Sequence, residues 1–294
     1  MVILSDGMRV GYACVNTQLP SSARTTRLAN ATPERLREVT AENLDALEAI
    51  LRWNAEHGIE VFRLTSNLVP FASHPVHTEP WWEEFAGRLA ELGRLAARHR
   101  MRLSTHPGQY PVLGSAREPV VDAAVAELEY HARLLEALGL DRSHKIVIHL
   151  TGDAGRLPAG FARLGDAARA RLVLENDERR SLAEVLDVAA ALGVPVVLDV
   201  FHHELNPSLD GLSTRELVLR AAGTWDAGDG RPEIHFSTQE PGKRPGAHAE
   251  TLDADAFARF AEEVGDLPVD CILEVKDKEQ SVLRAFDVLA GARA

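Results

Sequence analysis

Eight short runs rich in Val, Ile and Leu recur along the chain, and a longer segment with helical spacing of its apolar residues separates each run from the next. The runs occupy residues 9–12, 61–64, 101–104, 145–148, 171–174, 194–198, 233–236 and 271–274. Strands that alternate with helices predict an α/β fold with a parallel sheet. Eight such units in 294 residues favour a single (β/α)8 TIM barrel over residues 1–294, because this fold typically needs about 250 residues.

Helix signals support this alternation. Apolar residues at helical spacing lead up to Gly58 and to Gly139, at positions where left-handed helix ends favour glycine. Ser181 and Glu184 form a capping-box sequence, and the helix that they open can end at Gly193. The alternative is a doubly wound open sheet, which would more naturally show a glycine-rich phosphate turn after its first strand. Residues 11–16 contain no such turn.

The chain carries 32 basic and 44 acidic residues, a formal net charge of -12. This excess argues against a protein that holds nucleic acid through bulk positive charge, so a polyanionic partner would need a local patch or metal ions. Cys14 and Cys271 cannot build a disulfide framework, and we interpret them as small barrel fillers. The first residues show neither a signal-peptide core nor a stop-transfer run, and we expect a cytoplasmic protein with no membrane partner.

Polar side chains gather where the predicted strands end. They are Asn16, Ser66, His106, His149, Glu175, Asn176, Asp177, Asp199, His202, His203, His235 and Glu274, with His74, Glu233 and His248 beside them. Because the carboxyl ends of barrel strands converge on one face, we expect a metal site at that face. Any one of these residues alone could be a hydrogen-bonded cap or loop anchor, but their recurrence on six successive strands favours ligands. Imidazole and carboxylate without thiolate suit Mn2+, Zn2+ or Fe2+ in a catalytic site.

The number of candidate ligands favours more than one ion. About nine ligands, at three to five for each ion, allow two or three ions, and a central carboxylate such as Glu175 can bridge two of them. Paired ions stabilise the attacking and leaving oxygens of a phosphoryl displacement. The pattern therefore predicts hydrolysis of a phosphoester.

Several motifs stand in one order along the chain. They are Gly11-Tyr12 with Asn16, Thr-His-Pro-Gly-Gln-Tyr at 105–110, Leu-Glu-Asn-Asp at 174–177, Asp-Val-Phe-His-His at 199–203 and His-Phe-Ser at 235–237. Together they resemble the ultraviolet damage endonuclease family, from about residue 9 to about residue 289. The resemblance implies a metal-dependent barrel related to endonuclease IV and a DNA repair enzyme. Its substrate would be damaged double-stranded DNA, nicked immediately 5′ to a cyclobutane pyrimidine dimer, a (6-4) photoproduct or an abasic site, leaving 3′-hydroxyl and 5′-phosphate ends.

The resemblance also implies how the ligands divide among two or three divalent ions, with Mn2+ preferred and Zn2+ or Fe2+ as alternatives. One ion would be held by His106, His149 and Glu175, with His74 close by. A second would be held by Glu175, Asp199, His235 and Glu274, and a third by His202 and His248. Glu175, His235 and Glu274 are the expected catalytic residues, with Glu175 as the bridge. No organic cofactor is expected.

Six residues are expected to contact the damaged duplex. Gln109 and Tyr110 resemble the family's probe residues, which enter the duplex at the lesion and stabilise nucleotides taken out of the stack. Tyr12 and Asn16 match family positions on the first strand, while Lys243 and Arg244 lie in a basic loop after the seventh. Structural alternatives stay open: a loop aromatic for Tyr110, a core tyrosine for Tyr12, a cap for Asn16, and solvated side chains for the basic pair.

One position departs from the family pattern. Glu233 stands two residues before His235, where the family has a lysine that becomes carboxylated. Residues at i and i+2 lie on one face of a strand. We therefore expect Glu233 to replace the modified lysine. It would serve either as an anionic ligand of the third ion or as a group that contacts that ion's ligands.

Two other functional classes fit parts of the pattern. Sugar isomerases and epimerases use the same barrel and the same ligand types to move a proton or hydride on a ketose. They have no use for an exposed Gln-Tyr pair or for basic loops around the barrel mouth. A lesion-binding module without catalysis would keep the probe pair but could lose bridging ligands without penalty.

Overall fold

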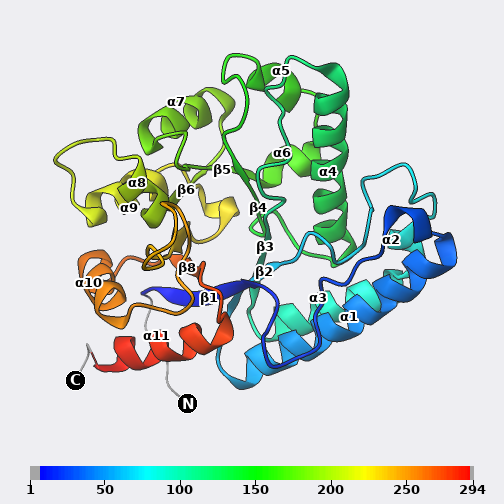
Figure 1. Cartoon of the computed structure of the whole chain (residues 1–294), viewed down its shortest axis with the longest axis horizontal. Helices are drawn as coiled ribbons and strands as arrows, with labels where there is room; N and C mark the ends of the chain where they lie inside the picture. The colour runs from blue at the N-terminus through cyan, green and yellow to red at the C-terminus, as the bar shows by residue number, and fades with distance from the viewer. Residues whose placement is uncertain (1–6, 292–294) are drawn as a thin grey trace. The chain divides into compact units, whose positions relative to one another are not determined.

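The computed structural model describes residues 7–291, and these contain all eight predicted strands (Figure 1). The strands are β1 Arg9–Cys14, β2 Val61–Leu64, β3 Arg102–Thr105, β4 Ile146–His149, β5 Leu172–Glu175, β6 Val196–Asp199, β7 Glu233–Phe236 and β8 Asp270–Leu273. No predicted boundary is displaced by more than two residues. The runs of β-branched and aliphatic residues are therefore confirmed as strands.

The strands form a closed barrel in the order of the sequence, from β1 to β8. The predicted TIM barrel is confirmed, and the doubly wound open sheet is wrong. β1 pairs with β8 in parallel, and Arg9 lies opposite Asp270 in the register. The Arg9 guanidinium donates two hydrogen bonds to the Asp270 carboxylate, each 2.7 Å long. This bidentate ion pair stabilises the pairing of the first strand with the last.

The chain divides into two compact units. The first contains the described residues up to Ala13, Ile59–Phe62 and the chain from Val173 onward. Its helices are α7 Leu182–Leu192, α8 Val200–Leu205, α9 Thr214–Ala222, α10 Ala254–Val264 and α11 Glu279–Gly291, with the short 3-10 helix Ala227–Asp229. That residues 1–294 behave as a single domain stays a prediction.

The second unit contains Cys14–Gly58 and Arg63–Leu172. Its helices are α1 Pro33–Glu56, α2 Trp81–Glu84, α3 Ala86–Arg98, α4 Glu118–Ala137, α5 Leu157–Phe161 and α6 Asp166–Arg171, with the short 3-10 helix Leu28–Asn30. Within this unit α1 and α3 run side by side (Figure 1).

Local signals determine where α7 begins and ends. The Ser181 side chain accepts the backbone N–H of Glu184, and the Glu184 carboxylate accepts the backbone N–H of Ser181. At the other end Gly193 has φ +68°, the left-handed conformation that glycine adopts without strain. The predicted capping box and the glycine stop are both confirmed. They place β6, and with it Asp199, directly after the helix.

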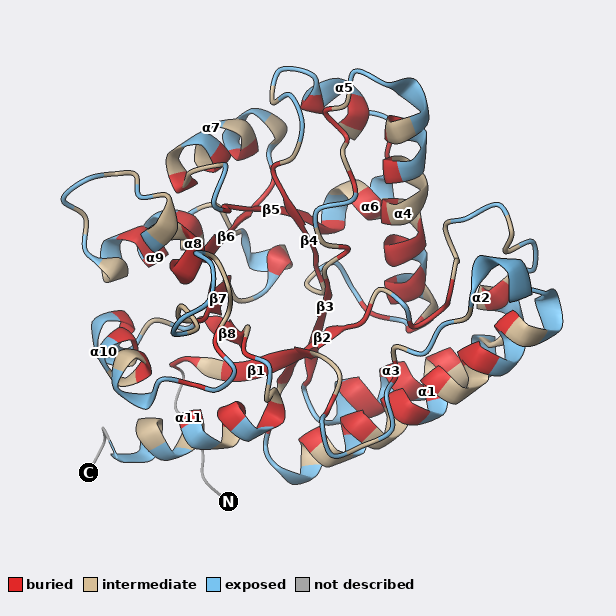
Figure 2. Cartoon of the chain, in the orientation of Figure 1, coloured by how far each residue is buried: buried red, intermediate tan, exposed pale blue. Residues whose placement is uncertain are grey.

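The strands supply the best-buried part of the structure (Figure 2). Every residue of β2 to β8 is buried, including the polar residues near their carboxyl ends. In the first unit the Tyr12 ring packs edge-on against Phe62, with ring centroids 5.0 Å apart. Packing of this kind holds side chains in single rotamers, so polar groups on the strands have well-defined positions.

No helix among residues 7–291 is both long enough and apolar enough to cross a membrane. The cytoplasmic location stays a prediction.

The contact between α3 and the end of α4 has no room for a side chain at Gly93. A β-carbon at Gly93 would lie 1.6 Å from the carbonyl oxygen of Leu138, the residue that caps α4. The same helix contains Gly87, where a β-carbon would meet no atom within 4 Å. One helix therefore offers both a forbidden and a permitted site for the same substitution.

We expect Gly93→Ala to destabilise the protein by about 3 kcal/mol or more, because the α4 backbone would have to move. Gly87→Ala should leave stability unchanged or raise it by up to about 1 kcal/mol, because alanine favours the helix. Urea unfolding followed by circular dichroism measures both. Equal effects of the two substitutions would show that α3 does not pack on α4 through Gly93.

Candidate metal centre

Four acidic and imidazole side chains of the first unit converge at the carboxyl ends of consecutive strands. They are Glu175, Asp199, His235 and Glu274, here called the carboxylate–imidazole cluster. Each offers one ligand atom, and these atoms all lie within 4.8 Å of one another. The first three side chains are fully buried and Glu274 is partly exposed. The structure therefore brings together the four predicted ligands of the second ion.

The strand ladder places these residues. Glu175 and Asp199 are the last residues of β5 and β6, and Asp199 lies opposite His235 in the register of β6 with β7. Glu274 follows β8 directly, and its backbone N–H donates to the carbonyl of Phe236, 2.9 Å away. Four neighbouring parallel strands thus present these candidate ligands at the same end.

Asn176 holds Asp199 in place, a role that the sequence did not reveal. Its Nδ2 donates to the Asp199 carbonyl and its Oδ1 accepts the Asp199 backbone N–H, both at 2.9 Å. The Asp199 Oδ1 accepts the backbone N–H of His202 at 2.7 Å and so caps α8. The available signal was an asparagine directly after the strand that ends in Glu175. Its hydrogen bonds to Asp199 on the next strand depend on the fold and could not be read from the sequence.

His235 lies between carboxylates on both sides of its ring. Its Nδ1 faces the Oε1 atoms of Glu175, at short hydrogen-bond distance, and of Glu274, at 3.5 Å. Its Nε2 faces Glu233 Oε1 at 3.2 Å. Glu233 is 1% exposed and is not one of the four members of the cluster.

The electrostatics of the cluster favour a cation. Burial, reinforced by the nearby carboxylates of Glu274 and Glu175, raises the pKa of Asp199 to about 8. Asp199 Oδ2 is buried and has no hydrogen-bond partner among the described residues 7–291. Crowded buried carboxylates are unfavourable unless positive charge compensates them. Nitrogen and oxygen donors without thiolate fit Mn2+, Zn2+ or Fe2+, so the residues present fit a divalent ion.

His202 and His248, the predicted ligands of a third ion, also lie close together. Their ring centroids are 5.4 Å apart. His248 Nδ1 lies 2.8 Å from the Glu274 carbonyl and 3.5 Å from Glu274 Oε2, so this pair adjoins the cluster. His202 Nδ1 lies 3.6 Å from Glu178 Oε2. The pairing agrees with the predicted grouping, while ligation of an ion by it stays a prediction.

In the second unit the structure brings His106 and His149 together. His149 ends β4 and His106 follows β3, and their ring centroids are 4.8 Å apart. His106 Nδ1 accepts the backbone N–H of Gly108 at 3.2 Å. His74 is exposed in the loop before α2, where its Nδ1 accepts the backbone N–H of Val76 at 3.0 Å. The role of His74 as a ligand stays a prediction.

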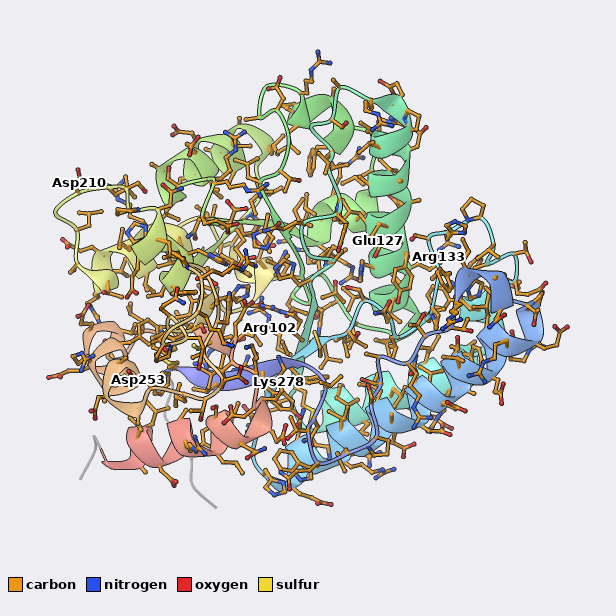
Figure 3. The ribbon with its side chains drawn as sticks, viewed as in Figure 1. Arg102, Glu127, Arg133, Asp210, Asp253 and Lys278 are labelled. Atoms are coloured by element: carbon orange, nitrogen blue, oxygen red, sulfur yellow. The ribbon has the colours of Figure 1, made fainter. Side chains whose placement is uncertain are left out.

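A pocket of about 480 Å³ lies beside the predicted probe pair. Tyr110 lines it with 90% of its surface exposed, and Gln109 is exposed next to it. Glu127 on α4 (Figure 3) lines the same pocket and accepts a hydrogen bond from Ser73 Oγ. Its other residues are Ser66, Asn67, His106, Pro107, Gly108, Pro111, Ala123 and Ala124. A large aromatic side chain held in water beside a hollow is unusual for a residue that serves only packing.

Tyr12 and Asn16 lie inside the protein. Tyr12 is 0% exposed, because β1 directs its ring into the core against Phe62. Asn16 is 2% exposed, and its Oδ1 accepts the backbone N–H of Gln18 at 2.9 Å. These environments match the structural alternatives, a core tyrosine and an asparagine cap. Direct contact of the Tyr12 ring with DNA would require it to leave the core.

Lys243 and Arg244 are exposed in the loop between β7 and α10. Gln239 organises this loop, since its Nε2 donates to the Arg244 carbonyl at 3.0 Å and its Oε1 accepts the Gly246 N–H at 2.9 Å. Both basic side chains are therefore available on a loop with a defined backbone.

Comparison with known proteins identifies the family of this chain. The family model described as UV-endonuclease UvdE matches residues 8–294. A UV DNA damage endonuclease of Clostridium perfringens is 34% identical, over 96% of this chain and 71% of its own length. The crystal structure of SacUVDE superposes with a TM-score of 0.91 and 38% identity, over 97% of this chain and 99% of that one.

A D-psicose 3-epimerase of Clostridium cellulolyticum also superposes, with a TM-score of 0.56 and 14% identity over 97% of this chain and 98% of that one. A likeness at this identity shows the barrel fold alone. The family match, the relatives and the SacUVDE superposition instead agree over nearly the whole length, and the chain belongs to the UV-damage endonuclease family.

Proposed function

We propose that this protein is a metal-dependent DNA repair endonuclease that hydrolyses the phosphodiester immediately 5′ to cyclobutane pyrimidine dimers, (6-4) photoproducts and abasic sites, leaving 3′-hydroxyl and 5′-phosphate ends. The observation that carries the proposal is the carboxylate–imidazole cluster at the ends of β5 to β8, in a chain of this family. The match to SacUVDE over nearly the whole of both chains supports it.

Two or three divalent ions would be held by the predicted ligands, with Mn2+ preferred over Zn2+ or Fe2+. The carboxylate–imidazole cluster would hold one ion, and His202 with His248 another. The assignment of His106, His149 and His74, with Glu175 as the bridge, rests on the family resemblance. When bound, the ions would supply Lewis-acid stabilisation of the charge that develops on the attacked phosphodiester.

The side chains around the cluster hold the ligands in fixed directions. Asn176 and the His202 N–H use the backbone groups and Oδ1 of Asp199, which leaves Oδ2 for a ligand bond. Full burial of Glu175 and His235 excludes bulk water from one side of the site. Charged ligands in such a site interact more strongly than they would in water.

The exposed loops account for recognition of damage. Tyr110 and Gln109 would enter the duplex at the lesion, and the adjoining pocket could receive a base taken out of the stack. A damaged pair is cheaper to open, so selectivity needs no sequence readout. Because the chain has a net charge of -12, its contacts with DNA phosphates must come from a local basic patch. Lys243 and Arg244 would provide such contacts.

The sugar isomerase or epimerase function is the alternative in the same fold. A closed sugar site gives no role to an aromatic side chain that is 90% exposed, and the epimerase likeness shows the fold alone. A duplex containing one cyclobutane dimer, incubated with and without Mn2+, separates the two functions. Only the nuclease produces a metal-dependent nick beside the dimer.

Glu175→Gln should lower cleavage of this duplex by roughly 100- to 1,000-fold or more, because the amide lacks the charge needed to hold the ions. Binding to the duplex, measured by fluorescence anisotropy, should stay within about threefold, because Glu175 is fully buried and offers DNA no exposed surface. The matched control is Asp187→Asn, an exposed carboxylate on α7, which should cleave at the wild-type rate. Unchanged nicking by Glu175→Gln would contradict the assignment.

Asp199→Asn should have opposite effects with and without metal. In metal-free protein near pH 7 it should raise the melting temperature. A carboxyl whose pKa is raised to about 8 must take up a proton or bury a charge on folding, whereas the amide does neither and keeps an oxygen for the His202 N–H. Wild-type protein should gain about 2.7 kcal/mol of stability at Mn2+ 100-fold above its Kd, and the variant much less. Differential scanning calorimetry tests both effects; an undiminished Mn2+ response in the variant argues against ligation by Asp199.

Tyr110→Ala should reduce cleavage of the dimer-containing duplex about 10- to 100-fold, through the loss of stacking worth about 1–3 kcal/mol. Tyr110→Phe keeps the ring and should cleave nearly as well as wild type. Both variants should melt at the wild-type temperature, because the ring is 90% exposed. Full activity of Tyr110→Ala on the damaged duplex would show that Tyr110 is not a probe residue.

A further inference from the structure

Glu233 and His235 form a buried pair on one strand, and the mechanism above gives Glu233 no part. They are the first and third residues of β7, and both side chains are completely buried. Glu233 Oε1 lies 3.2 Å from His235 Nε2, while Nδ1 on the other side of the ring faces Glu175 and Glu274. The two ring nitrogens thus face different carboxylates with different positions in the barrel.

The chemistry of the two groups determines which ring nitrogen can bind a metal. An ionised carboxylate only accepts hydrogen bonds, so the contact with Glu233 requires a proton on Nε2. In a neutral imidazole one nitrogen carries the proton and the other carries the lone pair. Nδ1 faces Glu175 in the same way, and an ion in the cluster would take the place of a proton between these two atoms. Nδ1 would then offer its lone pair to the ion while Nε2 keeps its proton for Glu233. Carboxylates that accept from the distal nitrogen of a metal-bound histidine orient its ring in this way.

The position of Glu233 along β7 separates it from the ligand atoms. It lies two residues before His235, roughly 6–7 Å further from the carboxyl end of the strand. In the register it is opposite Asp270, which begins β8 and binds Arg9. The other members of the cluster end their strands or follow them directly.

We propose that Glu233 is a positioning residue that fixes the His235 ring with Nδ1 presented to the metal, and that it is not itself a ligand. This inference rests on the proposed function in taking the cluster as a metal centre. Of the two roles expected for Glu233, ligand of an ion or partner of a ligand, the geometry favours the second. Glu233 would act on the metal only through His235.

Two variants of Glu233 separate positioning from ligation. Glu233→Gln keeps an oxygen that can accept from Nε2, whereas Glu233→Leu has a similar size and no acceptor. The full chain is used without DNA, so that the result does not depend on nuclease activity. A third variant, Glu279→Gln, alters a buried carboxylate on α11 outside the cluster and serves as the control.

Mn2+ titration calorimetry should give an affinity about 10- to 100-fold lower for Glu233→Leu, the usual effect of losing such a partner. Glu233→Gln should lose less than about fivefold and keep the wild-type stoichiometry, and Glu279→Gln should match wild type. Equal, large losses in Glu233→Gln and Glu233→Leu, or a lower stoichiometry in Glu233→Gln, would identify Glu233 as a ligand and overturn the proposal. Wild-type affinity in Glu233→Leu would overturn it as well.

Nitrogen-15 NMR of histidine-labelled, Zn2+-loaded wild-type protein tests the ring directly and remains decisive if Glu233→Leu does not fold. His235, assigned by comparison with His235→Gln, should carry its proton on Nε2 and bind through Nδ1. Binding through Nε2 would overturn the positioning role. Failure of the proposed function would be distinct: Mn2+ and Zn2+ would bind as expected, but no damaged duplex would be cleaved.

Discussion

Electrostatic repulsion among the carboxylates of Glu175, Asp199 and Glu274 is the constraint on which this site depends. Their ligand atoms and that of His235 lie within 4.8 Å of one another, and most of the group is buried. In water such charges would repel only weakly, but away from water the same separation is several-fold more unfavourable. Burial first, and then this repulsion, raises the pKa of Asp199, and a divalent cation at the cluster would turn the repulsion into attraction.

Backbone and amide hydrogen bonds hold the crowded carboxylates in place. The parallel ladder places the four strand ends side by side, and the Asn176 amide holds Asp199 through two bonds. The bidentate pair of Arg9 with Asp270 lies at the other end of β8 and joins it to β1. An ion pair thus stabilises the pairing of β1 with β8 at the amino end of β8, while the carboxylates of the cluster gather at the carboxyl ends, where a cation would compensate them.

Much of this architecture could be predicted because its signals are local. Short aliphatic runs, the Ser181–Glu184 capping box and Gly193 each act within a few residues, and the structure contains them as expected. That the polar side chains at these strand ends meet could be predicted because barrel topology brings strand ends together, whereas their grouping around one ion came from the family resemblance. Tyr12 could not be placed in this way, since alternation along a strand does not say which face points into the core. Asn176 stood among the polar strand-end residues, but its role in holding Asp199 could not be predicted because that partner lies on the next strand, 23 residues away in the chain.

Asp199 serves two neighbours with its two oxygens. Oδ1 caps the helix α8, which carries His202, and Oδ2 is buried without a hydrogen-bond partner among residues 7–291. In the proposed metal centre, the folding of a six-residue helix, too short to be stable alone, and the occupancy of the ion site would share one side chain. An extra methylene at this position would disturb both at once, so the length of the aspartate, and not only its charge, is under constraint.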